Sequence, residues 1–175
     1  MEIKTERFVL KEIDESYVED ILRIRSNEVI NQYVKRKSPK TNYDALEFIL
    51  TIKKKTQNRE ILFFGISYQN QRNLIGTICL WKFSEDRKTA EVGYELLPDY
   101  HQRGIMGEAL KSVLDYGFNT LKLQEVRAYT HKNNNASQQL LLKQGFVVKE
   151  GAIDEGNLDN IIFTLNKLKN DNIER

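Results

Sequence analysis

The stretch covering residues 90–121 constrains the fold more than any other part of the sequence. Residues 90–97 form an apolar segment rich in strand-forming residues, and it ends at Pro98. Beyond Pro98 the apolar residues recur at helical spacing, at Met106, Ala109, Leu110, Val113, Leu114, Gly117, Phe118 and Leu121. The sequence therefore predicts a buried strand, a short loop and a long helix that packs on the sheet containing that strand.

The loop before this helix carries Gly104 and Gly107. Backbone N–H groups at a helix N-terminus, together with the positive end of the helix dipole, can bind a phosphate group. Glycines let a ligand approach the backbone, and Arg103 adds a positive charge. The alternative is that the glycines only shape the turn and permit tight packing, and their spacing alone leaves both interpretations open.

Other glycine motifs fit this loop less well. The P-loop ends in Gly-Lys-Ser/Thr, and the dinucleotide fingerprint needs three glycines after the first strand; the sequence has neither. Residues 104–107 do fit the two-glycine clamp of a single-strand RNA-binding domain. That clamp joins two helices, whereas this loop follows a strand, so an RNA-binding module is the minor alternative.

The remaining apolar patterns predict further strands and helices. Strands are predicted over residues 8–13, 61–67, 74–81, 126–130, 146–148 and 161–165. Helices are predicted from a cap at Glu15-Ser16 to residue 25, from a cap at Thr41 or Asn42 to residues 53–55, and over residues 136–144. The expected fold class is α/β or α+β, with a mixed central sheet of about six to seven strands and helices on both faces.

Length and charge narrow the functional classes. The 175 residues are expected to form one domain, because the sequence shows no linker or internal repeat. The net charge of +2 is low for a nucleic-acid-binding surface.

Cys79 is the sole cysteine, which excludes an internal disulfide and a cysteine-pair metal site, and it is expected to be a buried strand residue. With no signal peptide or apolar span in the sequence, the expected location is the cytoplasm and no membrane partner is expected.

Several segments together resemble the GNAT family of N-acetyltransferases. Residues 101–109 resemble the family's acetyl-CoA pyrophosphate loop, whose pattern is Gln/Arg-x-x-Gly-x-Gly/Ala. Residues 5–10 resemble the opening of its ribosomal-protein (RimJ/RimL-like) branch, residues 90–94 its central strand, and residues 134–146 its last helix and turn. The resemblance covers nearly the whole chain. It departs from the family pattern at His101, where Gln or Arg is usual, and at Met106, where Gly or Ala is usual.

The resemblance implies that a primary amine attacks the thioester of acetyl-CoA, the cosubstrate, without an enzyme-bound intermediate. In this view the backbone of Leu96 and Leu97 pairs with the pantetheine arm as an added strand would. Asn134 contacts that arm where two strands separate. The pyrophosphate is bound mainly through backbone N–H groups of Gln102, Arg103, Gly104, Ile105, Met106 and Gly107, with the Met106 side chain pointing into the core.

Glu91 is the leading candidate for the general base, because burial in an apolar strand favours proton uptake by a carboxylate. The alternative is a strand carboxylate paired with a nearby Lys or Arg. Many relatives place a general-acid Tyr where this chain has Leu141, so the acid must come from elsewhere, and Ser137 and Asn134 are the nearest candidates. Ser137 is equally explained as a helix-cap residue. Because a free thiol has a pKa of about 8.5, a strong acid is not essential.

The acceptor amine is not identified by any motif. The basic run at residues 35–40 could attract an acidic acceptor or a CoA phosphate, or could be a solvated loop. A modest base slightly favours a protein N-terminus or a small amine over lysine, whose pKa is about 10.4. A CoA-binding relative with weak activity stays open as an alternative, and a homodimer is expected from the family resemblance alone.

Overall fold

The computed structural model describes residues 1–167, which form one eight-stranded sheet flanked by helices. Its strands are β1 (Glu2–Lys4), β2 (Phe8–Glu12), β3 (Leu62–Tyr68), β4 (Gly76–Trp81), β5 (Thr89–Leu96), β6 (Glu125–His131), β7 (Val147–Val148) and β8 (Asn160–Asn166). Its helices are α1 (Val18–Arg25), α2 (Glu28–Asn31), α3 (Asn42–Gln57), α4 (Ile105–Asn119) and α5 (Asn135–Lys143), with 3-10 turns η1 (Glu15–Tyr17) and η2 (Pro98–Tyr100). The mixed sheet confirms the predicted fold class.

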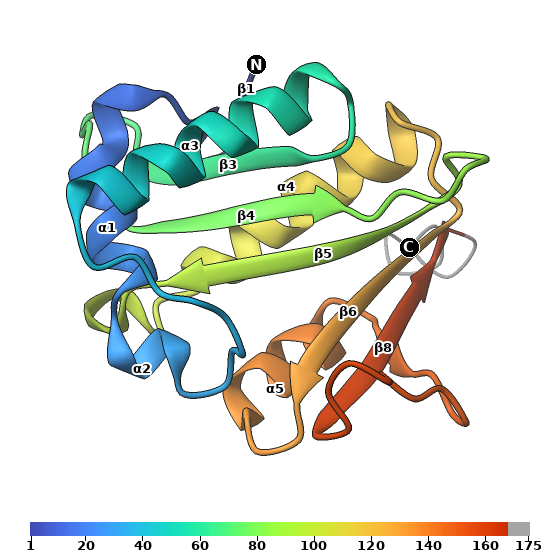
Figure 1. Ribbon diagram of the computed structural model, residues 1–175. Helices are drawn as coiled ribbons and strands as arrows, with labels where there is room; N and C mark the ends of the chain where they lie inside the picture. The colour runs from blue at the N-terminus through green and yellow to red at the C-terminus, as the bar shows by residue number, and fades with distance from the viewer. Residues whose placement is uncertain (168–175) are drawn as a thin grey trace.

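The two faces of the sheet are covered by different helices (Figure 1). On one face α4 buries its apolar side, and the core there includes Phe64, Leu110 and Val113, joined by Leu141 of α5. On the other face α1 and α3 pack over a second core that includes Ile21 and Ile49. The helices α1, α3 and α4 thus each present one apolar stripe to the sheet, as the spacing of apolar residues predicts.

The sheet is antiparallel except at one pair of strands, and this exception creates the cleft. The order is β1-β2-β3-β4-β5-β6-β8-β7, and β5 runs parallel to β6. Their pairing extends from Thr89 opposite Glu125 to Val92 opposite Ala128 and ends there. Beyond that point the two strands separate in a V, which is visible in Figure 1. The second half of β5 therefore has an edge that β6 does not cover.

The structure corrects the predicted elements in three places. The sheet has eight strands because the short β1 adds to β2, with Ile3 opposite Leu10. The short helix α2 was not predicted. In place of a cap at Glu15-Ser16, Asp14 caps the 3-10 turn η1 by accepting a hydrogen bond from the Ser16 N–H, and α1 follows with Tyr17 at its N-cap and no side-chain cap bond. Of the two caps predicted for α3, Thr41 is the one used, in a reciprocal capping box with Asp44.

Within residues 1–167, none of the helices combines the length and the apolar character that crossing a membrane would require.

Candidate active site

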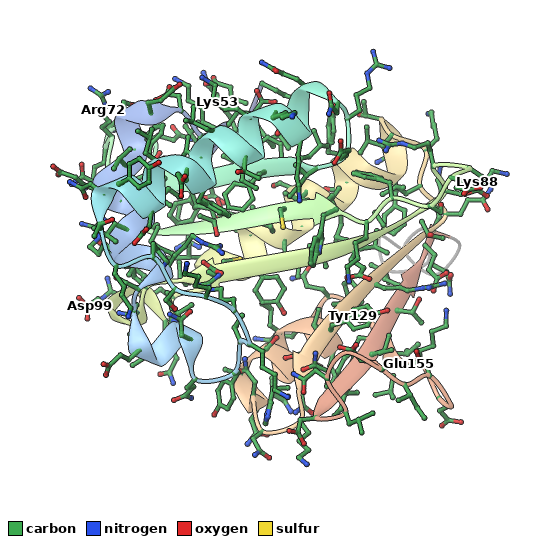
Figure 2. All side chains as sticks on the ribbon, viewed as in Figure 1. Lys53, Arg72, Lys88, Asp99, Tyr129 and Glu155 are labelled. Carbon is green, nitrogen blue, oxygen red and sulfur yellow. The ribbon has the colours of Figure 1, made fainter. Side chains whose placement is uncertain are left out.

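A cleft of about 590 Å³ lies where β5 and β6 separate, and it opens toward the α1 and α3 face. Its walls come from β3, β4, β5 and β6, the end of α1, the second half of α3, the start of α5, the loop that follows α2 and the segment before β8. Tyr129 lies on its β6 side, as Figure 2 shows. Among the predicted site residues, Glu91, Asn134 and Ser137 line this cleft. Leu96, Leu97 and residues 102–107 lie beyond its lining, toward the start of α4.

The glycine loop at the start of α4 has the geometry of an anion-binding turn. Gly104 is the N-cap and has a φ of +71°, a left-handed conformation that favours glycine. The first helical hydrogen bond is donated by the Glu108 N–H to the Gly104 carbonyl, so the N–H groups just before Glu108 are not used by the helix. The side chains of Ile105 and Met106 are buried in the core, which confirms the orientation expected for Met106. These residues can offer a ligand only their backbone.

An ion pair that sequence reasoning missed holds this loop against the N-terminal strands. Glu108 accepts hydrogen bonds from the Arg7 N–H at 2.8 Å, from Arg7 Nε at 2.7 Å and from Thr5 Oγ1 at 2.6 Å. Burial raises the pKa of Glu108, but the hydrogen bonds from Thr5 and Arg7 outweigh it and leave the pKa below its usual value. The Arg7 guanidinium also donates to the Arg103 carbonyl at 3.1 Å. Arg7 therefore ties the loop to the start of β2 while its own charge is balanced by Glu108.

The backbone of β5 offers less for strand pairing than the prediction required. Leu97 has both backbone groups bonded within the chain: its N–H donates to the Ile75 carbonyl at 2.9 Å, and its carbonyl accepts from the Tyr100 N–H at 3.0 Å. The Leu96 carbonyl accepts from His101 Nε2 at 2.8 Å. Pairing of Leu97 with a ligand would break bonds already made, because a backbone group that is already bonded gains little from a second partner.

A hydrogen bond joins β5 to the start of α5 at the point where β5 and β6 separate. The hydroxyl of Tyr94 and Ser137 Oγ lie 2.8 Å apart, and Asn134 caps α5 by accepting the Ser137 N–H at 3.1 Å. Burial raises the pKa of Tyr94 to about 12, with the Ser137 contact acting weakly in the opposite direction. Tyr94 thus keeps its proton over the working pH range. Leu141 is fully buried in the core, so it takes no part in the cleft.

Glu91 lies in the cleft wall and is paired there. Lys82 Nζ is 3.1 Å from one carboxylate oxygen and 3.3 Å from the other, and the Glu91 side chain is 14% exposed. The Lys82 ammonium also lies over the Trp81 ring, 4.6 Å from its centroid. The structure therefore shows both features considered for this residue, access to the cleft and a cationic partner.

The side of the cleft under α1 carries residues that the sequence patterns did not single out. Cys79 lies on β4 as expected, but its side chain is only partly buried and lines the cleft, and burial raises its thiol pKa to about 12. Arg25, Arg36 and Glu95 form an ion cluster, with Glu95 Oε1 paired to Arg36 and lying 3.6 Å from Arg25 Nη1. Their side chains are each at most 15% exposed. No local spacing links these three positions, because the chain brings them together only on folding.

Comparisons with known proteins agree with this geometry. Residues 7–147 match the family model described as an acetyltransferase (GNAT) domain. The uncharacterized N-acetyltransferase YoaA of Bacillus subtilis is 31% identical over 151 residues, covering 86% of this chain and 85% of YoaA.

Solved structures share the fold. The ribosomal-protein-S5-alanine acetyltransferase of Vibrio fischeri has a TM-score of 0.81 at 19% identity, over 95% of this chain and 96% of that protein. The microcin C7 self-immunity acetyltransferase MccE, solved with acetyl-CoA and AMP, has a TM-score of 0.76 at 20% identity, over 92% of this chain and 93% of MccE.

Proposed function

The chain belongs to the GNAT family of acetyltransferases, and on that premise we propose that it moves the acetyl group of acetyl-CoA directly to a primary amine bound in the cleft. The observation that carries the proposal is the V between β5 and β6, which opens next to an anion-binding turn. A protein N-terminus and a small amine are the two acceptor classes to be distinguished.

The residues at the V and at α4 fit acetyl-CoA. The backbone N–H groups before Glu108, with Arg7 and Arg103 alongside, suit a pyrophosphate. The uncovered edge of β5 suits the amide groups of a pantetheine arm, and we assign to it the N–H of Leu96, because the Leu96 carbonyl already accepts from His101 and both backbone groups of Leu97 are bonded. Acetyl-CoA supplies the activated acetyl group as a thioester. Everything else the reaction needs is positioning and proton transfer by this chain.

Glu91 is the residue we assign to removal of the amine proton, directly or through a water molecule. Its carboxylate lines the cleft on the α1 and α3 face, from which an acceptor enters. The paired Lys82 then holds the carboxylate in place and offsets its charge when no acceptor is bound. An α-amino group, with a pKa of about 7.7 to 8.0, needs less help from such a base than lysine does.

Ser137 is the residue we assign to the departing thiolate, to which its hydroxyl donates a hydrogen bond while the thiolate takes its proton from water. The hydroxyl of Tyr94 lies 2.8 Å from Ser137 Oγ and holds it in place. Burial raises the pKa of Tyr94 to about 12, so Tyr94 stays protonated and acts through this hydrogen bond rather than by giving up its proton. This pair stands in for the tyrosine that relatives carry at the position of Leu141.

The test combines cofactor binding with turnover. Acetyl-CoA affinity is measured by calorimetry, and thiol release is followed across a panel of peptides and small amines. We expect Glu91→Gln to lower turnover by about 10²- to 10⁴-fold with acetyl-CoA affinity within about twofold of the unmodified protein. Glu85→Gln is the matched control, because Glu85 is exposed and outside the cleft lining. Unchanged turnover in Glu91→Gln would remove Glu91 from the mechanism.

A CoA-binding protein of weak activity is the second candidate, and the Glu91 to Lys82 ion pair is the observation in its favour. In that case acetyl-CoA would bind in the calorimeter, and no amine of the panel would release thiol above the uncatalysed rate.

A further inference from the structure

Arg25 is a buried cation whose hydrogen-bonding capacity the protein does not use. It is the last residue of α1, its side chain is 15% exposed, and it lines the cleft. Its guanidinium stacks on Phe48, 3.9 Å from the ring centroid. Within residues 1–167 its side chain donates no hydrogen bond, and its ion-pair partner, Glu95 Oε1, is 3.6 Å away. A guanidinium carries five N–H donors, and those of Arg25 remain accessible in the cleft, where a ligand can accept from them.

The neighbouring Arg36 takes the charge of Glu95. Arg36 pairs with Glu95 Oε1 and donates to Asn31 Oδ1 from Nε at 3.1 Å and from Nη2 at 2.7 Å. Two buried guanidinium groups therefore share one carboxylate. Burial lowers the pKa of Arg25, and Arg36 acts in the same direction, while Glu95 opposes both. A buried cation without a full partner is costly unless a ligand completes it.

The wider cleft has the same excess of positive charge. Its lining includes the cations Arg25, Lys35, Arg36, Lys55 and Lys82 against the carboxylates Glu91, Glu95 and Asp154. Glu91 is already neutralised by Lys82. A polyamine or another polycation would meet repulsion here, whereas an acceptor with a negative group would be attracted.

We propose that the acceptor is an amine that also carries an acidic group, a carboxylate or a phosphate, and that Arg25 binds this group. The proposal rests on the proposed function and names its substrate class. Gly93 lies on the cleft floor between Glu91 and Glu95, where it leaves room for the reactive amine beside Glu91. The acidic group then contacts Arg25, whose N–H groups can hold both of its oxygens.

The opposing explanation is that the cluster of Arg25, Arg36 and Glu95 only ties α1 to β5. Removing Arg25 would then lower the melting temperature and would affect all acceptors equally. A binding role instead predicts discrimination between an acidic amine and its neutral counterpart. That discrimination is the quantity to measure, because a loss of stability alone does not alter it.

The experiment uses two matched pairs of amines in the thiol-release assay. Alanyl-alanine is compared with its C-terminal amide, and phosphoethanolamine with ethanolamine, so that carboxylate and phosphate are tested separately. We expect the acidic member of at least one pair to have a kcat/KM about 10 to 100 times higher. Arg25→Gln should remove that preference, mainly through KM. Arg25→Lys should keep part of the preference for the acidic amine, because lysine retains the positive charge but lacks the planar pair of N–H donors of a guanidinium.

Lys37→Gln is the control, since Lys37 is an exposed cation of the same loop as Arg36 but lies outside the cleft lining. It should keep the preference. Equal use of acidic and neutral amines by the unmodified protein, or a preference that survives in Arg25→Gln, would overturn the proposal and leave the acetyltransferase activity standing.

If acetyl-CoA binds but neither pair reacts, calorimetry of the CoA complex with N-acetyl-alanyl-alanine and with its amide decides instead. Tighter binding of the acid that Arg25→Gln abolishes supports the proposal, and equal binding overturns it. Failure of acetyl-CoA itself to bind would contradict the proposed function rather than the role of Arg25.

Discussion

Replacing Gly93 with alanine should separate acceptor binding from cofactor binding. Gly93 is on β5 where the strands part, and a Cβ added there would meet Cys79 Sγ at 3.4 Å and Trp81 Nε1 at 3.9 Å. Both are ordinary van der Waals contacts, so the fold can accept the methyl group. Exchanging glycine for alanine at a compatible position stabilises a protein by about 0.4 to 1 kcal/mol, because the unfolded chain loses freedom. For a chain of this length that raises Tm by about 1 to 4 °C.

The same methyl group would occupy the cleft floor between Glu91 and Glu95. Adding a methyl to a filled site costs about 1 to 3 kcal/mol, which lowers acceptor kcat/KM about 5- to 150-fold. Acetyl-CoA affinity should stay within about twofold. The measurements are a thermal melt, calorimetry with acetyl-CoA and thiol-release kinetics with the best amine of the panel.

Gly107→Ala is the counterpart, because Gly107 lies in the first turn of α4, next to the proposed anion site, and its Cβ would meet Gln144 and Leu140 at 3.6 and 3.7 Å. It should weaken acetyl-CoA binding and leave the acceptor KM unchanged. The reasoning would be refuted if Gly93→Ala weakened acetyl-CoA binding instead, or if acceptor kcat/KM stayed within twofold of its original value.

Three further substitutions test other parts of the structure. Tyr94→Phe should lower the rate of thiol release about 10-fold with acetyl-CoA affinity retained, as measured in the same assays, because Ser137 loses its 2.8 Å partner. Gly104→Ala should lower Tm by about 2 to 8 °C in a thermal melt and weaken acetyl-CoA binding, because a φ of +71° costs a non-glycine residue about 1 to 2 kcal/mol. Hydrogen bonds from Arg127 outweigh burial, and with those from Lys149 and Thr164 they hold the pKa of Glu125 to about 2, against an ordinary value of 4.5. The ionised Glu125 therefore stabilises the fold above pH 4.5, and this contribution is lost as the pH falls toward 2. In thermal melts across this range, Tm should fall less with decreasing pH in Glu125→Gln than in the unmodified protein.

Patterns that repeat within one element could be predicted from the sequence. The helical spacing over residues 106–121 predicts α4, which the structure places at Ile105–Asn119, and the alternation near residue 8 predicts β2. The sequence patterns do not predict β1, because three residues are too few to show an alternation of apolar and polar side chains; its pairing with β2 defines it. They do not predict α2 either, because its four residues carry no apolar stripe and no buried side chain.

The same distinction between local patterns and long-range contacts applies to the candidate site. The glycine loop is a local feature, so the spacing of its residues alone could indicate it. Arg36 and Glu95, by contrast, are 59 positions apart, and no sequence window contains both. The Ser137 to Tyr94 contact spans 43 positions and depends on how far the strands part. Such contacts form only when distant segments pack together, and neither the spacing of apolar residues nor the amino-acid composition predicts which segments do so.

The short pairing of β5 with β6 leaves an open strand edge inside the sheet rather than at its border. Open edges are where chains join other chains and aggregate. Here the edge borders a cleft of about 590 Å³, a size that suits a slender ligand. Storage with CoA should therefore protect the protein from precipitation as well as from heat, since a ligand that completes the sheet stabilises the native state by mass action.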